Sequence, residues 1–598
     1  MSRCAANLAF RIALCSALVA GSGNLYAGEN QPPDAQSSAT RERITQLIRQ
    51  LGDPDYFVRQ RAQDELARYG FEAFEALSAA TQDEDLEIAA RARYLLRLIR
   101  VEWTAGTDPE EVKQCLQNYE AQNFAGRVSR MQALAALPDA QGLTALCRLV
   151  RFEKTTQLSK MAAVSWLQSP QGLSPPTASA VRIIRENLQG CPRTAAGWLL
   201  CWARLGESAE AALAELDKAI EAETALLNRT PQESSAEIAS ALVRFQVDWL
   251  RQLGDQTTAL EKARRLVALE RGESLAELLA WLSARQAWQA IDELHQRFAP
   301  RIAADPALLY LLAEAYEQQG RRELAENAAG KALALNPGKQ EEQLLRHLQV
   351  AGLLRDRGRI AWAKREFEYI ITQVAPAENE LSAMARTFAA EMLHDHEQDL
   401  EAAQMLEKLV EALDAGKVNE QQLLGRSAKE VRSRLYYFHA CHWKSQGDEA
   451  RHREYLEKAL AADDEDIDVL IACYHLPHQT EEYRAKIKGL IQKAVADLRQ
   501  EIAAAPDDST PYNQLAWLVG NTEGDLDEAL TCSQKSLELQ PNTAGYYDTL
   551  AHVYFARGEL ENAVKYQTKA VELEPHSGLI RRQLDFFRKK LAEKQSTP

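Results

Sequence analysis

The stretch "DTLAHVYFARGELENA", residues 548–563, combines small and large residues in a way that predicts a helical hairpin. Ala551 and Ala563 are small, Gly558 lies between them, and Pro575 follows the second segment. Two antiparallel helices approach closely only where the side chains at their contact are small. Glycine permits the left-handed turn that ends a first helix, and proline ends a second one. We therefore expect two packed helices joined at Gly558.

The same pattern recurs in phase elsewhere in the chain. Residues 306–339 place Ala313, Gly320, Ala325 and Pro337 at the corresponding positions. Partial copies lie at residues 344–376, 433–466 and 510–543, and weaker ones centre on Gly254 and Leu393. This helix–turn–helix unit of about 34 residues resembles the tetratricopeptide repeat (TPR).

A second kind of repeat occurs near the N-terminal end. Residues 52–70 and 82–100 share an acidic turn followed by an apolar stripe at helical spacing. Asp55 in the first copy matches Asp85 in the second, at a position where an aspartate can cap a helix. Further matched pairs are Val58 with Ile88, Arg61 with Arg91, Ala62 with Ala92, and Leu66 with Leu96. The pattern resembles HEAT-like repeats.

These repeats together predict an all-α, right-handed α-solenoid, HEAT-like at first and TPR-like afterwards. The predicted divisions are a signal peptide at 1–27, a disordered linker at 28–40, HEAT-like repeats at 41–168, a proline-rich linker at 169–180, degenerate TPR-like helices at 181–300, a TPR array at 301–577, and a C-terminal capping helix and tail at 578–598.

The first residues have the pattern of a secretory signal. Arg3 and Arg11 provide positive charge, residues 12–20 form a short apolar core, and Ala27 stands at a plausible cleavage point. We expect a Sec-type signal peptide and a periplasmic or secreted protein, with an uncleaved anchor as the alternative. No later segment is apolar enough to span a bilayer, so no transmembrane segment is expected in the mature chain.

Composition excludes some classes of partner and of scaffold. The chain has 598 residues and a formal charge of −16, which argues against nucleic acid as the main partner. Nine cysteines are too few for a disulfide framework in a chain of this length. A single bridge between Cys441 and Cys473 is the one pairing considered, and the simpler interpretation is that the cysteines are small buried side chains.

Motifs of catalysis are missing from the mature sequence. HExxH, Walker, GxSxG and GxGxxG patterns are absent, so we expect no enzyme activity and no cofactor. A metal site is an alternative, because histidines and cysteines gather in two nearby segments. Its candidate ligands are His439, Cys441, His442, Cys473, His475 and His478. Pro477 interrupts the second segment, so ordinary partly buried histidines are the simpler interpretation.

The TPR resemblance implies where a partner would bind. In that family the first helix of each repeat lines a concave groove. Carried over to this chain, the implied partner-binding residues are Tyr310, Glu314, Tyr437, Lys444, Gln514, Trp517, Asp548, His552 and Phe555. An aromatic and acidic groove of this kind suits a peptide with basic and apolar residues. A merely solvated inner surface is the alternative.

The resulting hypothesis is a non-enzymatic protein–protein interaction scaffold of the bacterial cell envelope, binding a peptide or protein on its concave face. One alternative is an envelope enzyme or glycan-processing factor with catalytic groups at helix ends. The other is a metal-binding protein using the histidine and cysteine segments named above.

Overall fold

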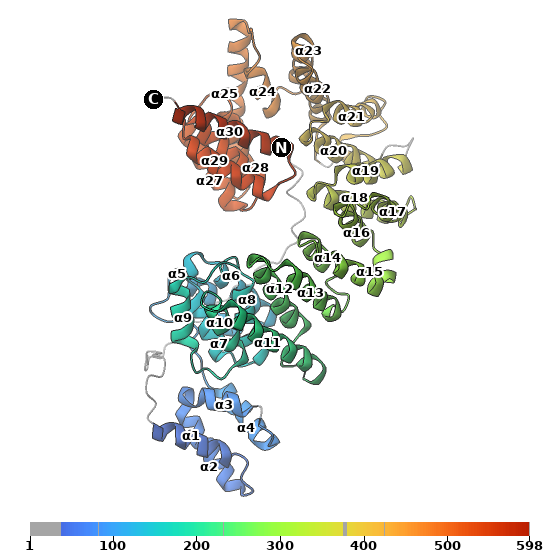
Figure 1. Cartoon of the computed structure of the whole chain (residues 1–598). Helices are drawn as coiled ribbons and strands as arrows, with labels where there is room; N and C mark the ends of the chain where they lie inside the picture. Colours follow the sequence, from blue (N-terminus) through green and yellow to red (C-terminus); the bar gives the residue numbers. More distant parts are fainter. Residues whose placement is uncertain (1–37, 82, 231, 375–378, 424, 597–598) are drawn as a thin grey trace. The chain divides into compact units, whose positions relative to one another are not determined.

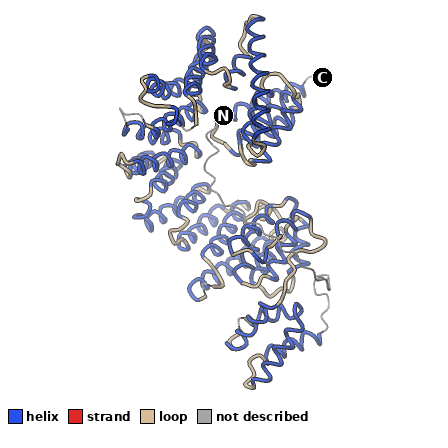
Figure 2. The backbone as a smooth tube through the Cα atoms, turned by 180° about the vertical axis from the view of Figure 1, so that it is seen from behind, coloured by secondary structure: helices blue, strands red, loops and turns tan. Residues whose placement is uncertain are grey.

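The computed structural model describes residues 38–596, except residues 82, 231, 375–378 and 424. The predicted signal peptide lies outside these residues. Every regular element of the described part is a helix, and Figure 2 shows no strand among them. The helices form two compact units, one ending at Ile302 and the other beginning at Ala303. The chain is an all-α solenoid.

The N-terminal unit contains the helices up to α15 (Figure 1). They are α1 (Ser38–Gln50), α2 (Tyr56–Tyr69), α3 (Phe74–Ala80), α4 (Leu86–Leu98), α5 (Glu110–Leu116), α6 (Phe124–Ala136), α7 (Leu143–Phe152), α8 (Thr156–Leu167), α9 (Ala178–Leu188), α10 (Thr194–Arg204), α11 (Ala209–Arg229), α12 (Ala236–Gln252), α13 (Gln256–Leu269), α14 (Leu275–Ala284) and α15 (Trp288–Ala303).

The two matched segments of this unit fold alike. The Asp55 side chain caps α2 by accepting from the Phe57 N–H, and the Asp85 side chain caps α4 by accepting from the Glu87 N–H. Ala62 on α2 is buried, as is the matching alanine on α4. The acidic turn therefore starts both helices, and the apolar stripe faces the core. Their assignment as HEAT-like repeats stays a prediction.

An ion pair lies deep in the N-terminal unit. The Lys160 ammonium is 2.7 Å from a Glu223 carboxylate oxygen and also donates to the Glu233 carbonyl. The Lys160 and Glu223 side chains are both almost fully buried. Such a pair persists because each buried charge compensates the other.

The C-terminal unit contains the remaining helices. They are α16 (Pro306–Gln318), α17 (Arg322–Ala334), α18 (Glu341–Asp356), α19 (Ile360–Val374), α20 (Glu380–Asp395), α21 (Asp399–Asp414), α22 (Ala428–Ser445), α23 (Glu449–Ala462), α24 (Ile467–Tyr474), α25 (Glu481–Ala504), α26 (Ser509–Gly520), α27 (Leu526–Leu539), α28 (Ala544–Ala556), α29 (Leu560–Leu573) and α30 (Gly578–Ser596).

The hairpin predicted from residues 548–563 is formed by α28 and α29. Ala551 and Ala563 are fully buried between the two helices. Gly558 joins them with φ of +79°, a left-handed conformation that favours glycine. The Tyr554 ring fills the space beside the alanines and stacks on Tyr566, with 5.2 Å between the ring centroids. Small residues thus set the close helix contact, as their spacing predicts.

Helix α30 covers the end of the array, over the segment where a capping helix is predicted. Leu584 and Phe587 face inward and are buried, whereas Leu579 is partly exposed. The Phe587 ring stacks on Phe555 of α28 at 4.8 Å. The last repeat therefore packs its apolar face against α30 instead of exposing it to solvent.

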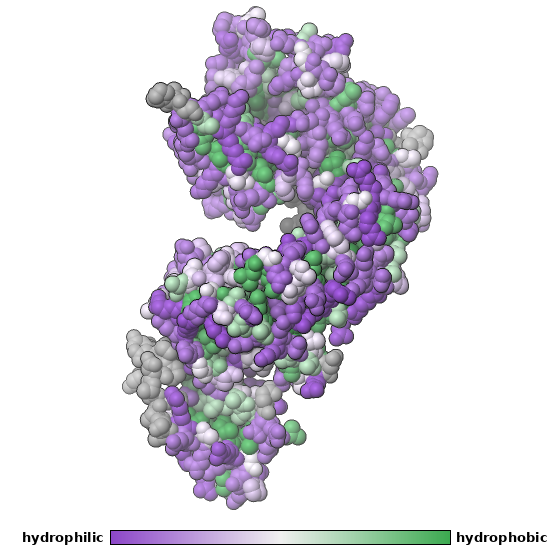
Figure 3. Space-filling model, in the orientation of Figure 1, coloured by the Kyte–Doolittle hydropathy of each residue, from purple (hydrophilic) through white to green (hydrophobic). Residues whose placement is uncertain are grey.

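The visible surface of both units is mainly hydrophilic, with scattered apolar residues (Figure 3). None of the helices in the described part combines the length and apolarity needed to cross a membrane.

Candidate functional site

A hollow of about 600 Å³ lies in the C-terminal unit, between the start of α22 and the end of α29. We call it the acidic groove, because acidic side chains dominate its lining. These are Glu430, Asp463, Glu465, Asp466, Asp468, Asp497, Glu501, Asp548 and Glu574. Its volume falls within the range of pockets that hold small ligands or short peptide segments.

The basic residues of the acidic groove are already paired with acids. Arg426 lies 3.3 Å from a Glu391 oxygen, and Lys429 lies 2.7 Å from a Glu465 oxygen. Arg434 bridges Glu391 at 2.8 Å and Asp468 at 2.9 Å. Because these cations are engaged within the protein, the lining keeps a surplus of negative charge for a partner.

An indole ring lies among these carboxylates. Trp517 of α26 donates its Nε1–H to Asp468 Oδ1 at 3.0 Å. Its ring meets His552 edge to face at 4.8 Å, and the far side of His552 packs on Phe587. Burial lowers the pKa of His552, which favours the neutral imidazole. These contacts fix the orientation of Trp517 and leave it half-buried in the groove.

Asp466 and Asp468 stand at the start of α24, and each carboxylate oxygen of the pair has a donor. Asp466 Oδ1 accepts from the backbone N–H groups of Asp468 and Val469, and its Oδ2 accepts from the Ser433 hydroxyl. The two Asp468 oxygens accept from Trp517 and from Arg434. Desolvation raises the pKa of Asp466; Arg434 opposes this effect and Asp468 adds to it. Helix capping and ion pairing account for both residues.

The far end of the groove is also acidic. Asp548 of α28 is nearly buried, and its Oδ1 accepts from Gln567 Nε2 at 2.6 Å. Glu574 follows α29; desolvation, and next the Asp395 carboxylate, raise its pKa. Burial and a neighbouring carboxylate disfavour the ionised form of Glu574, and a cation that approaches stabilises that form.

Of the residues implied by the TPR resemblance, the groove contains Gln514, Trp517 and Asp548. His552 and Phe555 lie behind it, where both rings pack against Phe587 of α30.

The remaining implied residues lie elsewhere in the C-terminal unit. Tyr310 is buried, and its hydroxyl donates to Glu366 at 2.5 Å. Glu314 is nearly buried and holds two arginines, Arg357 and Arg359. Tyr437 is half-buried beneath the Arg434 guanidinium, and Lys444 is exposed on α22.

Most of the groove carboxylates do not follow from the TPR resemblance, because they sit on loops and helix starts and not on the inner face of the first helices. The signal available for them in the sequence was the acidic run at residues 463–468, which lies directly before α24.

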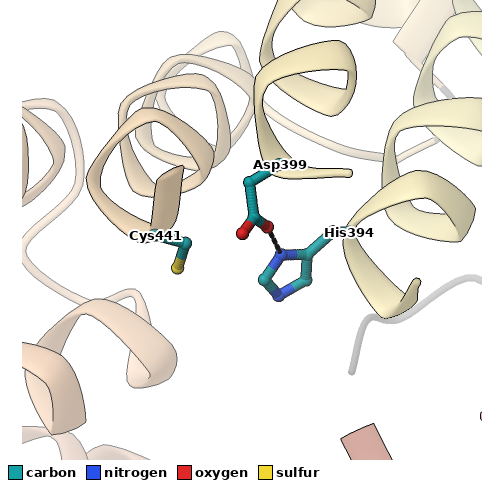
Figure 4. Close-up of side chains that lie close together, drawn as sticks. All are labelled: His394, Asp399 and Cys441. Carbon is teal, nitrogen blue, oxygen red and sulfur yellow. Dashed lines mark hydrogen bonds and ion pairs between the residues drawn. The ribbon is translucent and has the colours of Figure 1, made fainter. Parts of the chain in front are cut away.

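A second cluster brings together His394, Asp399 and Cys441 (Figure 4). One ligand atom from each lies within 4.8 Å of the others. His394 Nδ1 and Asp399 Oδ1 are 2.5 Å apart. Burial, and next the Asp399 carboxylate, raise the pKa of the Cys441 thiol to about 12.

This cluster differs from the metal site considered from the sequence. Only Cys441 belongs to both; among the others, His439 contacts Glu407 at 3.0 Å and His475 contacts the Asn521 carbonyl. Cys473 is buried in the core, and burial raises its pKa to about 11. All seven cysteines of the described residues are free thiols.

Comparison with protein-family models matches the tetratricopeptide repeat at residues 306–339 and 544–577. The chain contains tetratricopeptide repeats. These are the two segments whose small residues, glycine and proline match the pattern most completely. Proteins built of such repeats bind protein partners on the extended surfaces that the stacked helices form.

Three solved structures have a partial likeness to this chain. YrrB, described as a TPR protein with an unusual peptide-binding site, is 19% identical over 33% of this chain and 89% of its own, with a TM-score of 0.16. The P58(IPK) TPR domain is 15% identical over 57% and 99%, with a TM-score of 0.17. Naa15/Naa10 bound to HypK-THB is 15% identical over 93% and 97%, with a TM-score of 0.22. No curated protein matches the sequence.

Proposed function

We propose that this protein is a non-enzymatic scaffold of the cell envelope that binds a basic, partly apolar peptide segment of a partner protein in its acidic groove. The observation that carries the proposal is the unbalanced charge of the groove, whose three basic residues are engaged by its own acids or by Glu391. Lysine or arginine side chains of a partner would compensate the remaining carboxylates.

The groove also offers an apolar contact. The Trp517 ring is fixed by Asp468 and His552 before any partner arrives, so its ordering costs little on binding. Tryptophan is among the residues that most often dominate binding energy at interfaces. An apolar residue between two basic ones therefore suits this surface.

The envelope location rests on the sequence of residues 1–27, with its two arginines and short apolar core. Cell fractionation combined with N-terminal sequencing of the mature protein tests it. A processed chain in the periplasm or medium is expected. A full-length chain retained in the cytoplasm would contradict the location without bearing on the groove.

The binding claim can be tested with a fluorescent peptide that alternates lysine and leucine, and with a matched peptide in which glutamate replaces lysine. We expect binding of the basic peptide only, weakening as salt rises, because exposed charges are screened. The double variant Asp497→Asn/Glu574→Gln should lower the affinity by about two- to thirtyfold, since each of the two exposed pairs contributes about 0.2–1 kcal/mol.

A matched double variant controls for total charge. Glu481→Gln/Glu482→Gln removes two acids from exposed positions outside the groove lining and should bind like the wild type. Equal binding of both peptides, or equal losses in the two double variants, would refute the assignment of the groove. In-cell crosslinking with wild type and Trp517→Ala then identifies the natural partner by its loss from the variant.

The groove contains neighbouring carboxylates, and such pairs can act as acid and base in an enzyme. Asp466 and Asp468, two residues apart at the start of α24, are one such pair. Their oxygens already accept from backbone N–H groups, Ser433, Arg434 and Trp517, so their arrangement favours a structural role.

A further inference from the structure

Three different ligand types converge at one place in the C-terminal unit. His394 lies in the last turn of α20, Asp399 is the first residue of α21, and Cys441 lies on α22. Figure 4 shows the three side chains pointing toward a common space between these helices. Imidazole nitrogen, carboxylate oxygen and thiolate sulfur are the three ligand types that Zn²⁺ takes from proteins.

The ligand side chains are held in place by their surroundings. The His394 ring stacks on Phe438 at 4.7 Å and meets Tyr437 edge to face at 5.7 Å. Its Nδ1 contacts Asp399, and the side chains of the two residues are only 15% and 11% exposed. Tyr437 also lies within hydrogen-bonding reach of the Cys441 thiol. A packed ring and neighbouring hydrogen bonds orient metal ligands in advance.

We propose that His394, Asp399 and Cys441 bind one Zn²⁺ ion, with an exchangeable water in the fourth position. Bonds of about 2.0 Å to nitrogen and oxygen and about 2.3 Å to sulfur, at tetrahedral angles, place ligand atoms roughly 3.3–3.6 Å apart. The atoms of this cluster lie within 4.8 Å of one another, and His394 Nδ1 and Asp399 Oδ1 are 2.5 Å apart. Small side-chain rotations that separate this pair and bring the Cys441 thiol closer give the required distances.

Protons leave the ligand atoms as the ion enters. Cys441 coordinates as a thiolate, and its proton passes to solvent. The ion takes the place of the His394 Nδ1 proton that is donated to Asp399 Oδ1. That proton passes to solvent if the imidazole is doubly protonated, or is replaced by one taken up at Nε2 if it is neutral, so that the bound imidazole is neutral with its proton on Nε2. Three protein ligands with a water in the fourth position is the ligand number known from catalytic zinc sites, whereas closed structural sites have four. Zinc here would tie α20, α21 and α22 together.

Arg434, one of the cations close to Cys441, does not block this assignment. Arg434 lies over the rings of Tyr437 and Phe438, at 5.1 and 4.9 Å. Its charge is compensated by Glu391 and Asp468, to which it is directly paired.

The test uses the full mature chain purified without a histidine tag and stripped with a chelator. Zinc is titrated in competition with a chromophoric chelator, and cobalt is substituted to reveal thiolate–metal charge-transfer absorption. We expect about one zinc ion per chain and a cobalt spectrum with that absorption. Cys441→Ser, His394→Ala and Asp399→Asn should each lower zinc affinity by at least about tenfold.

Two variants outside the three proposed ligands serve as matched controls, and both should bind zinc like the wild type: Cys115→Ser far along the chain and His442→Ala next to Cys441. Circular dichroism checks that each ligand variant keeps its helices. The cobalt spectrum of the wild type tests the proposal even if a variant fails to fold. Clearly less than one zinc per chain at excess metal, cobalt bound without a thiolate band, or unchanged affinity in Cys441→Ser would each overturn the proposal.

Discussion

A buried network of three side chains joins the first TPR to the helices that follow it, α18 and α19. The Glu366 carboxylate accepts from the Tyr310 hydroxyl with one oxygen and contacts His347 Nδ1 with the other. His347 Nε2 faces the Asn336 carbonyl at 2.9 Å. Both ring nitrogens therefore face acceptors, which only a doubly protonated imidazole can satisfy.

The pKa of His347 reflects this arrangement. Burial lowers it, but the hydrogen bonds to Glu366 and Asn336 raise it more, and the net pKa lies above the usual value of about 6.5. A folded-state pKa above the unfolded one contributes stability that is complete below about pH 6.5 and is lost as pH rises through the folded pKa. Where the folded and unfolded pKa values differ by about one, the contribution is about 1.4 kcal/mol.

Glu366→Gln should reverse the sign of this pH dependence. The amide can accept from Tyr310 and donate to a neutral His347, but burial then dominates and lowers the pKa of His347. Stability is in that case lost as pH falls below about 6.5. Between pH 8.5 and 5.5 we expect the variant to lose about 1–3 kcal/mol relative to wild type, if the pKa of His347 differs by about one to two between the two proteins.

Hydrogen exchange measured by mass spectrometry on peptides from α16–α19 reports the stability of these two hairpins separately from the rest of the solenoid. Rates are corrected for the intrinsic pH dependence of exchange. Glu368→Gln, a partly exposed position on the same helix, should keep the wild-type pH dependence. Parallel pH dependence in Glu366→Gln and wild type would refute the assignment of a charged His347.

Three further predictions concern packing, and thermal or urea unfolding of the full chain checks each. Lys160→Met should cost about 3–5 kcal/mol because it leaves Glu223 buried and unpaired, and adding Glu223→Leu should recover most of that loss; equal stability of the single and double variants would contradict this. Gly558→Ala should destabilise its hairpin by about 1–2 kcal/mol because φ is positive there. The control Gly330→Ala, at an exposed position within α17, should stabilise that helix by about 0.5–1 kcal/mol. Ala563→Leu should cost about 1–3 kcal/mol by overpacking the buried contact between α28 and α29, and an unchanged midpoint would show that the contact is loose.

The helices, their turns and their caps could be predicted from the sequence because they depend on neighbours close along the chain. Gly558 adopts the left-handed conformation that its place in the repeat requires, and Ala551 and Ala563 meet at the helix contact. The aspartate before each matched N-terminal segment caps its helix for the same local reason. Periodicity and capping act within one or two turns.

Which side chains face a partner was decided by contacts between repeats. The TPR resemblance places both Tyr310 and Gln514 on the concave face, yet Tyr310 is buried against Glu366 of α19 while Gln514 lines the acidic groove. The sequence groups Cys441 with Cys473 as candidate metal ligands, but the neighbours of Cys441 in space are His394 and Asp399. The repeat determines that a position points inward; the packing of α18–α22 and of α24–α29 determines what it meets there, because those neighbours lie tens of residues away and vary from repeat to repeat.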